Sequence, residues 1–292
     1  MDMAIDTQVK KQVREFYDQV GWQEVSEGVY QNAHYEDLRP VSREYIHRCH
    51  MRVIRHLKPT GRFLLDAGSG PIQYPEYLEF SRGYTYRVCL DISEVALLEA
   101  RKRIHSHGLF VVGDIAHLPF KSNCFEGLVS LHTIHHIPED EHLKAYFELY
   151  RSLMPGCKGV VVNGWPSSRL MRWANPLIRF SHRLQWIFAP KNEKVDAEEV
   201  NGDYLGKSKP AEPKGTFTRK LGVDWMKNSL AKQIPITIWV WRSVSVRFMR
   251  ALIHPWLGGR FWLRVIYRLE ELFPRYFGEN GQYPLIVINK PK

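Results

Sequence analysis

The sequence has little cysteine and no long hydrophobic run, and each absence excludes a class of protein. Its four cysteines are scattered over 292 residues without a Cys-x-x-Cys pair. We therefore expect neither a disulfide framework nor a metal site. No charge-free apolar run approaches the ~18 residues that a membrane-spanning helix needs. The first residues also lack the basic and apolar regions of a signal peptide, so we expect a cytoplasmic protein.

Acidic residues are scarce in the second part of the chain. Residues 1–164 carry 19 Lys and Arg against 21 Asp and Glu, whereas residues 165–292 carry 22 against 10. Eight of the nine tryptophans also lie in residues 165–292. This asymmetry indicates that the second part meets something anionic or interfacial. The alternative is a solvated basic face with structural tryptophans.

Two stretches before residue 58 repeat apolar residues at helical spacing. The first includes Val9, Val13 and Phe16 and ends at Gly21, and the second runs from Ile46 to Leu57. We expect residues 1–58 to form a helical cap that leads into the core.

Between residues 59 and 165, short apolar runs alternate with helix-compatible segments, which predicts a core with five strands. The predicted strands are Phe63–Leu65, Tyr84–Leu90, Leu109–Val112, Phe125–Leu131 and Gly159–Asn163. Ser93 is the predicted N-cap of one helix, and another is predicted over Glu139–Met154, ending at Pro155-Gly156. Such alternation predicts a doubly wound α/β fold with a mostly parallel sheet and helices on both faces.

The regular alternation ends after Trp165. Residues 166–234 are expected to form a basic, Trp-rich insertion with a helix broken at Asn175-Pro176 and a mobile loop over 191–220. Residues 235–292 are expected to complete the same domain with strands Ile236–Trp241 and Tyr283–Asn289 around an Arg-rich helix. That helix carries Arg260, Arg264 and Arg268 beside an apolar side of Trp262, Val265, Leu269 and Leu272.

Three acids stand at comparable places in the predicted core. Asp66 ends the first strand, Asp91 ends the second, and Asp114 follows the third. The carboxyl ends of neighbouring strands meet along one crevice in a doubly wound sheet, so these acids can surround an adenosine. Asp91 is placed to accept from the ribose hydroxyls and Asp114 from the adenine amino group, with the N–H of Ile115 reaching a ring nitrogen.

A Gly68-Ser69-Gly70 turn follows the first strand and lets the backbone approach a ligand closely. The glycines are expected to place the N-terminus of the next helix, around Glu76–Phe80, at the end of the strand. A dinucleotide is disfavoured because Gln73 stands where its fingerprint needs a third glycine. The pattern favours a nucleoside with a non-phosphate tail.

Four ordered segments of the core are Leu65–Pro71, Leu90–Ser93, Gly113–Phe120 and Phe125–Ile137. Together they resemble the motifs of class I S-adenosylmethionine-dependent methyltransferases, with the closest similarity to the ubiquinone/menaquinone-biosynthesis group. The resemblance covers residues 60–165 and the last strand. It implies a seven-stranded sheet with an antiparallel last strand, and S-adenosylmethionine as the cofactor. Ile72 departs from the family pattern, which often has a third glycine there.

The resemblance also implies which residues contact the cofactor. The glycine turn would approach the methionine part, and Asp66 would organise the loop or contact the methionine amino group. In similar enzymes the N-terminal region folds over the cofactor, so the cap of residues 1–58 would act as a lid that excludes water, and an aromatic residue or Arg of it would touch the methionine carboxylate. A cap that merely packs on the core is the alternative. The expected contact residues are Asp66, Gly68, Ser69, Gly70, Asp91, Ile92, Asp114, Ile115, His132, Tyr17 and Arg39.

Three histidines follow the fourth strand, beside the expected position of the methyl group. Histidine can act as a general base near neutral pH, which makes His132 and His135 the candidate catalysts. The alternative is that His135 caps the next helix and His136 packs under the sheet edge. Methyl transfer is an in-line displacement that can proceed by positioning alone.

These features predict a methyltransferase for a small or amphiphilic acceptor such as a lipid, a quinone, a glycan-linked molecule or a secondary metabolite. The arginines suit an anionic group on the acceptor. Arg stripes beside apolar, Trp-bearing faces are also typical of helices at a membrane interface, so peripheral contact at the inner face of a membrane is a second expectation. An RNA methyltransferase is less favoured, because no Asn/Asp-Pro-Pro-aromatic motif follows the fourth strand. A non-catalytic protein that keeps the fold is the other alternative.

Overall fold

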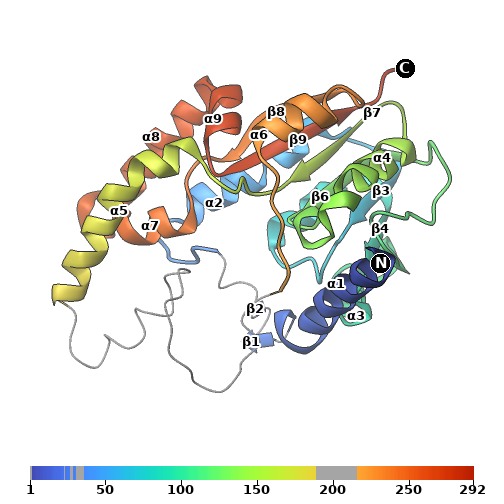
Figure 1. The fold of residues 1–292 in the computed structure, drawn as a ribbon, viewed down its shortest axis with the longest axis horizontal. Coiled ribbons are helices and arrows are strands. Elements are labelled where there is room, and N and C mark those ends of the chain that lie inside the picture. The colour runs from blue at the N-terminus through green and yellow to red at the C-terminus, as the bar shows by residue number, and fades with distance from the viewer. Residues whose placement is uncertain (1, 23, 27–28, 31–35, 189–215) are drawn as a thin grey trace.

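A seven-stranded sheet runs through the molecule (Figure 1). The computed structural model describes residues 2–22, 24–26, 29–30, 36–188 and 216–292. The strand order is β5-β4-β3-β6-β7-β9-β8. The strands are β3 (Gly61–Ala67), β4 (Tyr84–Asp91), β5 (Gly108–Val112), β6 (Phe125–Leu131), β7 (Leu153–Val162), β8 (Ile236–Arg242) and β9 (Tyr283–Asn289).

Strand direction places the ends of most strands at one edge. β9 runs antiparallel to both β7 and β8, and the other neighbouring pairs are parallel. β8 therefore points the same way as β3–β7, so six strands end at the same edge. This confirms the predicted mostly parallel, doubly wound fold.

Helices cover both faces of the sheet. The last four residues of β3 are all buried, although successive side chains point to opposite faces. Leu64 and Leu65 are neighbours, yet they belong to different core clusters on opposite faces. The helices are α1 (Asp2–Phe16), α2 (Arg43–His50), α3 (Glu94–Ile104), α4 (His142–Ser152), α5 (Arg169–Phe188), α6 (Val223–Trp225), α7 (Val246–Leu252), α8 (Gly259–Leu272) and α9 (Pro274–Asn280). Two short strands, β1 (Glu24–Ser26) and β2 (Val29–Tyr30), form a separate hairpin.

The predicted end of one helix and start of the next strand were wrong. α4 ends at Ser152, and β7 begins at Leu153 instead of Gly159. The N–H of Cys124 donates to the carbonyl of Ser152 at 2.9 Å, and Leu153 is extended and pairs with Phe125. The loop before β6 thus draws the chain out of the helix before Pro155 is reached.

The helix expected directly at the glycine turn is absent from this part of the described chain. A 3₁₀ helix, Pro75–Ser81, begins five residues after Gly70, and its N-cap Tyr74 is extended. Ile72 has a φ of 55°, in the left-handed region that interrupts a right-handed helix. The helix that follows the turn in the sequence therefore does not begin at the turn.

The second part of the chain departs from prediction in two further places. α5 continues through Pro176 instead of breaking there. Proline has no N–H to donate to the carbonyl one turn earlier, but Pro176 lies on the exposed side of the helix, where water can hydrogen-bond to that carbonyl. In α8 the predicted apolar side is turned to solvent, and Leu263, Tyr267 and Glu270 face the protein instead. The predicted loop 191–220 lies mostly outside the described residues, and residues 216–220 form neither helix nor strand.

Candidate active site at the carboxyl edge of the sheet

The glycine turn after β3 is held in a backbone shape that requires its glycines. Gly68 and Gly70 have φ values of 75° and 53°. The N–H of Gly68 donates to the carbonyl of Leu90 at 2.7 Å, which ties the turn to the end of β4. A Cβ on Gly68 would lie 2.2 Å from the side chain of Thr133. The turn is therefore tightly packed, and its backbone shape requires glycines.

Ile72 has a left-handed backbone, which glycine adopts more readily than any other residue. Its φ of 55° is rare for a β-branched residue, and its side chain is fully buried in a core cluster. Burial of that side chain offsets the strain of the left-handed backbone. The turn thus accommodates Ile72 in place of the glycine that the family resemblance predicts there.

Asp91 joins the glycine turn to the start of α3. Its Oδ2 accepts from the N–H of Gly70 at 2.9 Å, and its Oδ1 accepts from the N–H of Ser93 at 2.9 Å. Ser93 caps α3 as predicted, because its Oγ accepts from the N–H of Ala96. Burial raises the pKa of Asp91 to about 6, although the backbone donors lower it. Each carboxylate oxygen keeps a further lone pair for a ribose hydroxyl.

Asp114 is engaged by a residue that the sequence did not point to. It accepts from Lys10 Nζ at 2.6 Å, from His117 Nδ1 at 3.1 Å and from the N–H of Ala116 at 2.9 Å. Burial alone would raise the pKa of Asp114, but the hydrogen bond from Lys10 and the Ala116 N–H lower it. Oδ1 still has room for one more donor, so a contact with an adenine amino group remains open.

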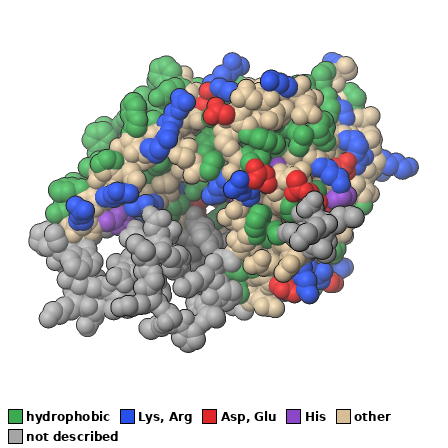
Figure 2. All heavy atoms as spheres, viewed as in Figure 1, with side chains coloured by type: hydrophobic (Ala, Val, Ile, Leu, Met, Phe, Trp, Pro, Cys, Tyr) green, Lys and Arg blue, Asp and Glu red, His purple; other side chains and the backbone are tan. Residues whose placement is uncertain are grey.

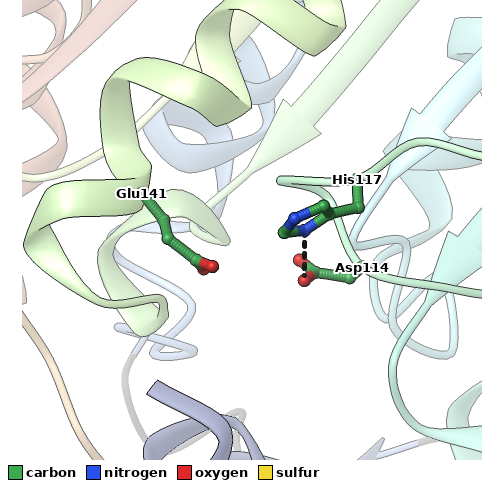
Figure 3. A group of neighbouring side chains, drawn as sticks. All are labelled: Asp114, His117 and Glu141. Carbon is green, nitrogen blue, oxygen red and sulfur yellow. Dashed lines mark hydrogen bonds and ion pairs between the residues drawn. The ribbon is translucent and has the colours of Figure 1, made fainter. Parts of the chain in front are cut away.

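Asp114, His117 and Glu141 converge on one point (Figure 3). The ammonium of Lys10 already occupies this point, with hydrogen bonds of 2.6 Å to both Asp114 and Glu141. A positive charge of the chain itself thus balances the two carboxylates.

The N-terminal segment covers the site. We call residues 8–22, the described side chains of α1 and the turn after it, the lid. Tyr17 Oη lies 2.9 Å from His136 Nε2, and its ring stacks on Trp22 with centroids 5.0 Å apart. Trp22 in turn lies against Gly70, where its ring would be 3.0 Å from an added Cβ. Ser93 Oγ donates to Asp18 on the same segment.

Tyr17 was predicted from the sequence, whereas Lys10, Asp18 and Trp22 were missed. Helical periodicity alone places Lys10 on the polar side of α1 and gives no sign of its partner. The predicted contact residues Ser69, Ile92 and Ile115 lie in the loops after β3, β4 and β5, and Ile115 is buried in the core.

Asp66 forms a buried ion pair with Arg87 of β4. Its Oδ2 accepts from both Nε and Nη2 of Arg87, at 3.0 and 2.5 Å, and both side chains are buried. Arg87 also donates to the carbonyl of Tyr77. Of the two predicted roles, this geometry favours the organising one over contact with a methionine amino group.

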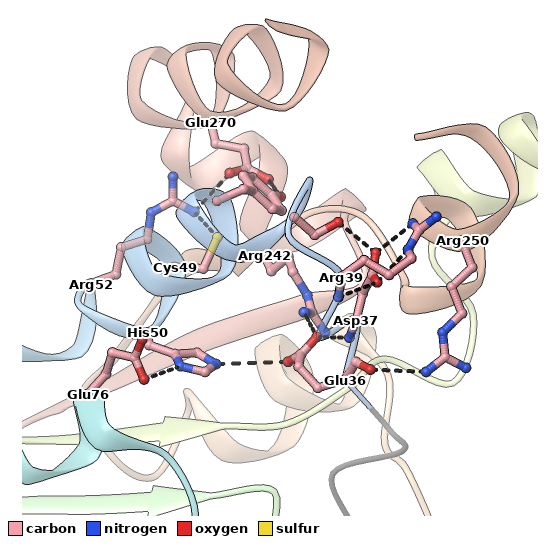
Figure 4. A network of polar contacts seen from close by, with 12 residues as sticks. Glu36, Asp37, Arg39, Cys49, His50, Arg52, Glu76, Arg242, Arg250 and Glu270 are labelled. Carbon is pink, nitrogen blue, oxygen red and sulfur yellow. Dashed lines mark hydrogen bonds and ion pairs between the residues drawn. The ribbon is translucent and has the colours of Figure 1, made fainter. Parts of the chain in front are cut away.

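Arg39 is likewise committed elsewhere. Its guanidinium donates to both oxygens of Asp37 at 2.7 Å and to the carbonyl of Met249 at 2.8 Å (Figure 4). It therefore braces α7, and its geometry does not support the predicted contact with a methionine carboxylate.

Imidazoles and aromatic rings gather over the ends of β6, β7 and β8. The ring of His132 lies 5.1 Å from Trp241 and 5.8 Å from Tyr283, and its φ is 56°. His135 Nδ1 lies 3.3 Å from Asn163 Oδ1, just after β7. His136 Nδ1 lies 2.9 Å from the carbonyl of Phe217. Asn163 was not predicted, although a polar residue directly after a buried strand is a signal for it.

Burial keeps these histidines neutral. It lowers the pKa of His132 to about 3, with the nearby Arg242 as a further cause. It also lowers the pKa of His136 to about 4 and that of His135 well below its usual range. Neutral imidazoles can accept hydrogen bonds, but such low pKa values make them weak bases.

A buried ionic network supports this side of the site (Figure 4). Arg242, at the end of β8, donates to the carboxylate of Glu36, and both side chains are buried. Its guanidinium lies 4.6 Å from the centre of the Tyr283 ring. His50 lies 3.8 Å from Glu36 and 3.6 Å from Glu76. Although burial opposes it, Arg242 and His50 lower the pKa of Glu36 to about 2.

Comparison with known proteins decides the class of this site. Residues 65–161 match the family described as "Methyltransferase domain". This segment is a class I S-adenosylmethionine-dependent methyltransferase domain. The domain spans β3 to β7, and so includes the glycine turn and all three acids. No curated protein sequence matches the chain. The narrower resemblance to the ubiquinone/menaquinone group stays a prediction.

Solved structures share the fold of this methyltransferase at low sequence identity. Phosphoethanolamine N-methyltransferase 2 of Haemonchus contortus, in complex with S-adenosylmethionine, is 16% identical with a TM-score of 0.52, over 96% of this chain and 60% of that chain. A Haloferax volcanii methyltransferase, in complex with the activator Trm112, is 16% identical with a TM-score of 0.51, over 86% and 92%. The [4+2]-cyclase SpnF is 17% identical with a TM-score of 0.50, over 97% of each chain.

Proposed function

We propose that this methyltransferase methylates a small or amphiphilic acceptor bound over the ends of β6, β7 and β8. The observation that carries the proposal is the division of the carboxyl edge into two halves. Asp91, Asp114 and the glycine turn stand over β3–β5. His132, Asn163 and Trp241 stand over β6–β8. The first half suits an adenosyl group and the second suits an acceptor lying against rings.

His132 is the residue that we place against the acceptor. It is a non-glycine residue in the left-handed region, and residues held in that way gather at functional sites. Its side chain is half-buried, whereas that of His135 is buried and held by Asn163. His135 and His136 then position the loop and the lid, while His132 meets the acceptor.

The low pKa of His132 bears on the kind of acceptor. When bound, S-adenosylmethionine supplies a methyl group on a sulfonium, and the carbon–sulfur bond breaks as the acceptor's lone pair bonds to the methyl carbon. A base with a pKa of about 3 cannot efficiently ionise an ordinary hydroxyl. An amine or an activated carbon needs less help, because holding it in line supplies much of the rate. We therefore favour N- or C-methylation.

A lysine beside this half supports an anionic group on the acceptor. Lys220 Nζ would lie 3.4 Å from a Cβ on Gly164, whose surroundings also include Tyr283. Among the described residues, no carboxylate lies within ion-pair distance of Lys220. Burial lowers the pKa of Lys220, as expected for a cation without a neighbouring anion. A carboxylate or phosphate on the acceptor would provide an anion to pair with Lys220.

Labelled S-adenosylmethionine tests the proposal. The protein is incubated with the labelled cofactor and, separately, with lipid, polar small-molecule and RNA extracts. We expect label in a lipid or small-molecule fraction, and its loss with Asp91→Ala. Label in RNA would contradict the proposed acceptor class, and no transfer to any fraction by a protein that binds the cofactor would contradict catalysis by this chain.

A further inference from the structure

Helix α8 packs with its apolar stripe turned away from the protein. Phe261, Trp262 and Leu272 are exposed, Leu272 by 69%. Glu270, on the opposite side of the helix, is 0% exposed. An amphipathic helix of a globular protein normally shows the reverse arrangement.

Buried charges fix α8 in this orientation. The carboxylate of Glu270 accepts from Tyr45 Oη at 2.7 Å, from Arg52 Nη1 at 2.9 Å and from the N–H of Ser243 at 2.8 Å (Figure 4). Arg52 also pairs with Glu271. Rotation of the helix would leave these groups buried without partners, at a cost of several kcal/mol. The outward apolar stripe is therefore a stable feature of the fold.

Helix α5 repeats the arrangement. Ile178 is buried, and Ser181 Oγ donates to the carbonyl of Ala251 on α7 at 2.6 Å, so this side faces the protein. The opposite side carries Trp173, Leu177 and Phe180, and Trp173 is 83% exposed. Trp256, in the turn that precedes α8, is 78% exposed.

Arginines border both apolar stripes and outnumber the acids beside them. On α5 the sequence has four arginines and no Asp or Glu. On α8 the ladder of Arg260, Arg264 and Arg268 is exposed. Arg52 pairs with both glutamates of α8, and Arg264 pairs with Glu44 of α2 at 2.9 Å. In Figure 2, hydrophobic and basic side chains lie together along the margin where Figure 1 places α5 and α8. The surface is thus apolar and positively charged at once.

We propose that this surface binds the face of an anionic lipid bilayer. We define it as the interfacial face: Trp173, Leu177, Phe180, Trp256, Trp262 and Leu272, with the bordering arginines of α5 and α8. Tryptophan favours the boundary between lipid tails and water, and arginine pairs with anionic headgroups. Helices with such faces lie in the plane of a membrane. No helix within the described parts of the chain is long and apolar enough to cross one.

Two features of the face, its rows of arginines and the apolar stripes beside them, favour a bilayer over other binding partners. A bilayer is anionic at its surface and apolar a few ångströms below, so it can bind the arginines and the apolar side chains together. RNA offers charge but no apolar layer for Leu177 or Leu272. The proposal goes beyond the methyl transfer, since it needs neither cofactor nor acceptor.

Vesicle co-sedimentation tests the interfacial face. The full chain is mixed with vesicles of phosphatidylcholine alone, or with about one third phosphatidylglycerol, at roughly 0.1 M salt. We expect pelleting with the anionic vesicles and at least ~10-fold weaker binding for the triple variant Trp173→Ala/Trp256→Ala/Trp262→Ala. Leu98→Ala, an exposed apolar residue of α3, serves as the matched control and should bind normally.

Two further measurements separate the outcomes. Cofactor binding of the triple variant should equal that of the parent, because the three tryptophans are exposed side chains of α5, α8 and the turn before α8, outside the predicted cofactor site. Brominated lipids should quench the tryptophan fluorescence of the parent and not that of the triple variant. Failure to pellet with anionic vesicles, equal binding of parent and triple variant, or binding of RNA in place of vesicles would each overturn the proposal.

Discussion

Lys10 and Asp114 form a 2.6 Å ion pair that joins the first helix to the end of β5, across 104 residues of sequence. The same ammonium binds Glu141, so one lysine ties the lid to two loops of the core. Asp114 is the acid that we predict to meet the adenine, so this ion pair would fasten the lid at the cofactor site. Any opening of the lid would have to break it.

We expect Lys10→Met to speed the exchange of S-adenosylmethionine. Loss of two part-buried ion pairs loosens the lid, so the dissociation rate should rise several-fold and the affinity should fall. Stopped-flow fluorescence with Trp22 near the turn reports the rate. Lys11→Met is the matched control, because Lys11 is exposed and meets only its helical neighbour Glu15, at 3.8 Å. Equal rates for the two variants would show that Lys10 does not fasten the lid.

Cofactor affinity should depend on pH through Asp91. Burial raises its pKa to about 6, and ribose hydroxyls donate to the ionised form, so binding favours the deprotonated state. Affinity should therefore be constant above pH 6 and weaken by up to ~10-fold per unit below it. Calorimetric titration from pH 5 to 8 measures this. A flat profile in the parent protein would contradict the placement of the ribose, and Asp91→Asn should lose the dependence.

Breaking the pair of Asp66 and Arg87 should destabilise the fold. Arg87→Met leaves a buried carboxylate without its partner, which typically costs ~3–5 kcal/mol of unfolding free energy. Urea unfolding followed by circular dichroism gives the value. Asp66→Asn in the same background should recover part of the loss. Lys102→Met, which removes an exposed pair with Glu99, should change stability by less than ~1 kcal/mol. Similar effects for the buried and exposed pairs would contradict this reading of Asp66.

Gly68→Ala should abolish cofactor binding. An added Cβ would collide with Thr133 at 2.2 Å, and the φ of 75° disfavours any side chain. Thermal unfolding and calorimetric titration would separate loss of fold from loss of the site. Gly222→Ala is the matched control, since no atom lies within 4 Å of its added Cβ. Normal cofactor affinity in Gly68→Ala would mean that the turn does not approach the cofactor.

The role of His132 can be read from pH profiles. With a pKa of about 3, His132 stays neutral above pH 6, so kcat should show no ionisation of this residue between pH 6 and 9. His132→Ala should raise the acceptor KM more than the cofactor KM. A kcat profile with a pKa near 7 that disappears in His132→Ala would instead identify His132 as a general base.

Local sequence signals were sufficient for much of the fold. β6 and β9 were predicted to the residue, because each is an apolar run bounded by loop residues. Asp91 and the N-cap Ser93 follow from their place after a strand. These features depend on neighbours along the chain, which a sequence displays directly.

Long-range pairs could not be predicted, because nothing local marks their partners. Lys10 with Asp114 and Glu36 with Arg242 lie 104 and 206 residues apart. Periodicity in α8 revealed a stripe but not which side is buried, since that depends on Glu270 meeting Arg52. For Arg39 the unpredictable contact is the one with the carbonyl of Met249, 210 residues away, because its other partner Asp37 is a near neighbour in the sequence.

Titration calorimetry with S-adenosylmethionine at pH 7.5 tests most directly whether the carboxyl edge of β3–β5 holds the cofactor. The parent protein should bind one equivalent, and Asp91→Ala should lose ~1.5–3 kcal/mol of binding free energy while its circular dichroism spectrum is unchanged. A folded parent protein that binds no S-adenosylmethionine, or an Asp91→Ala variant that binds it equally well, would contradict this placement of the cofactor.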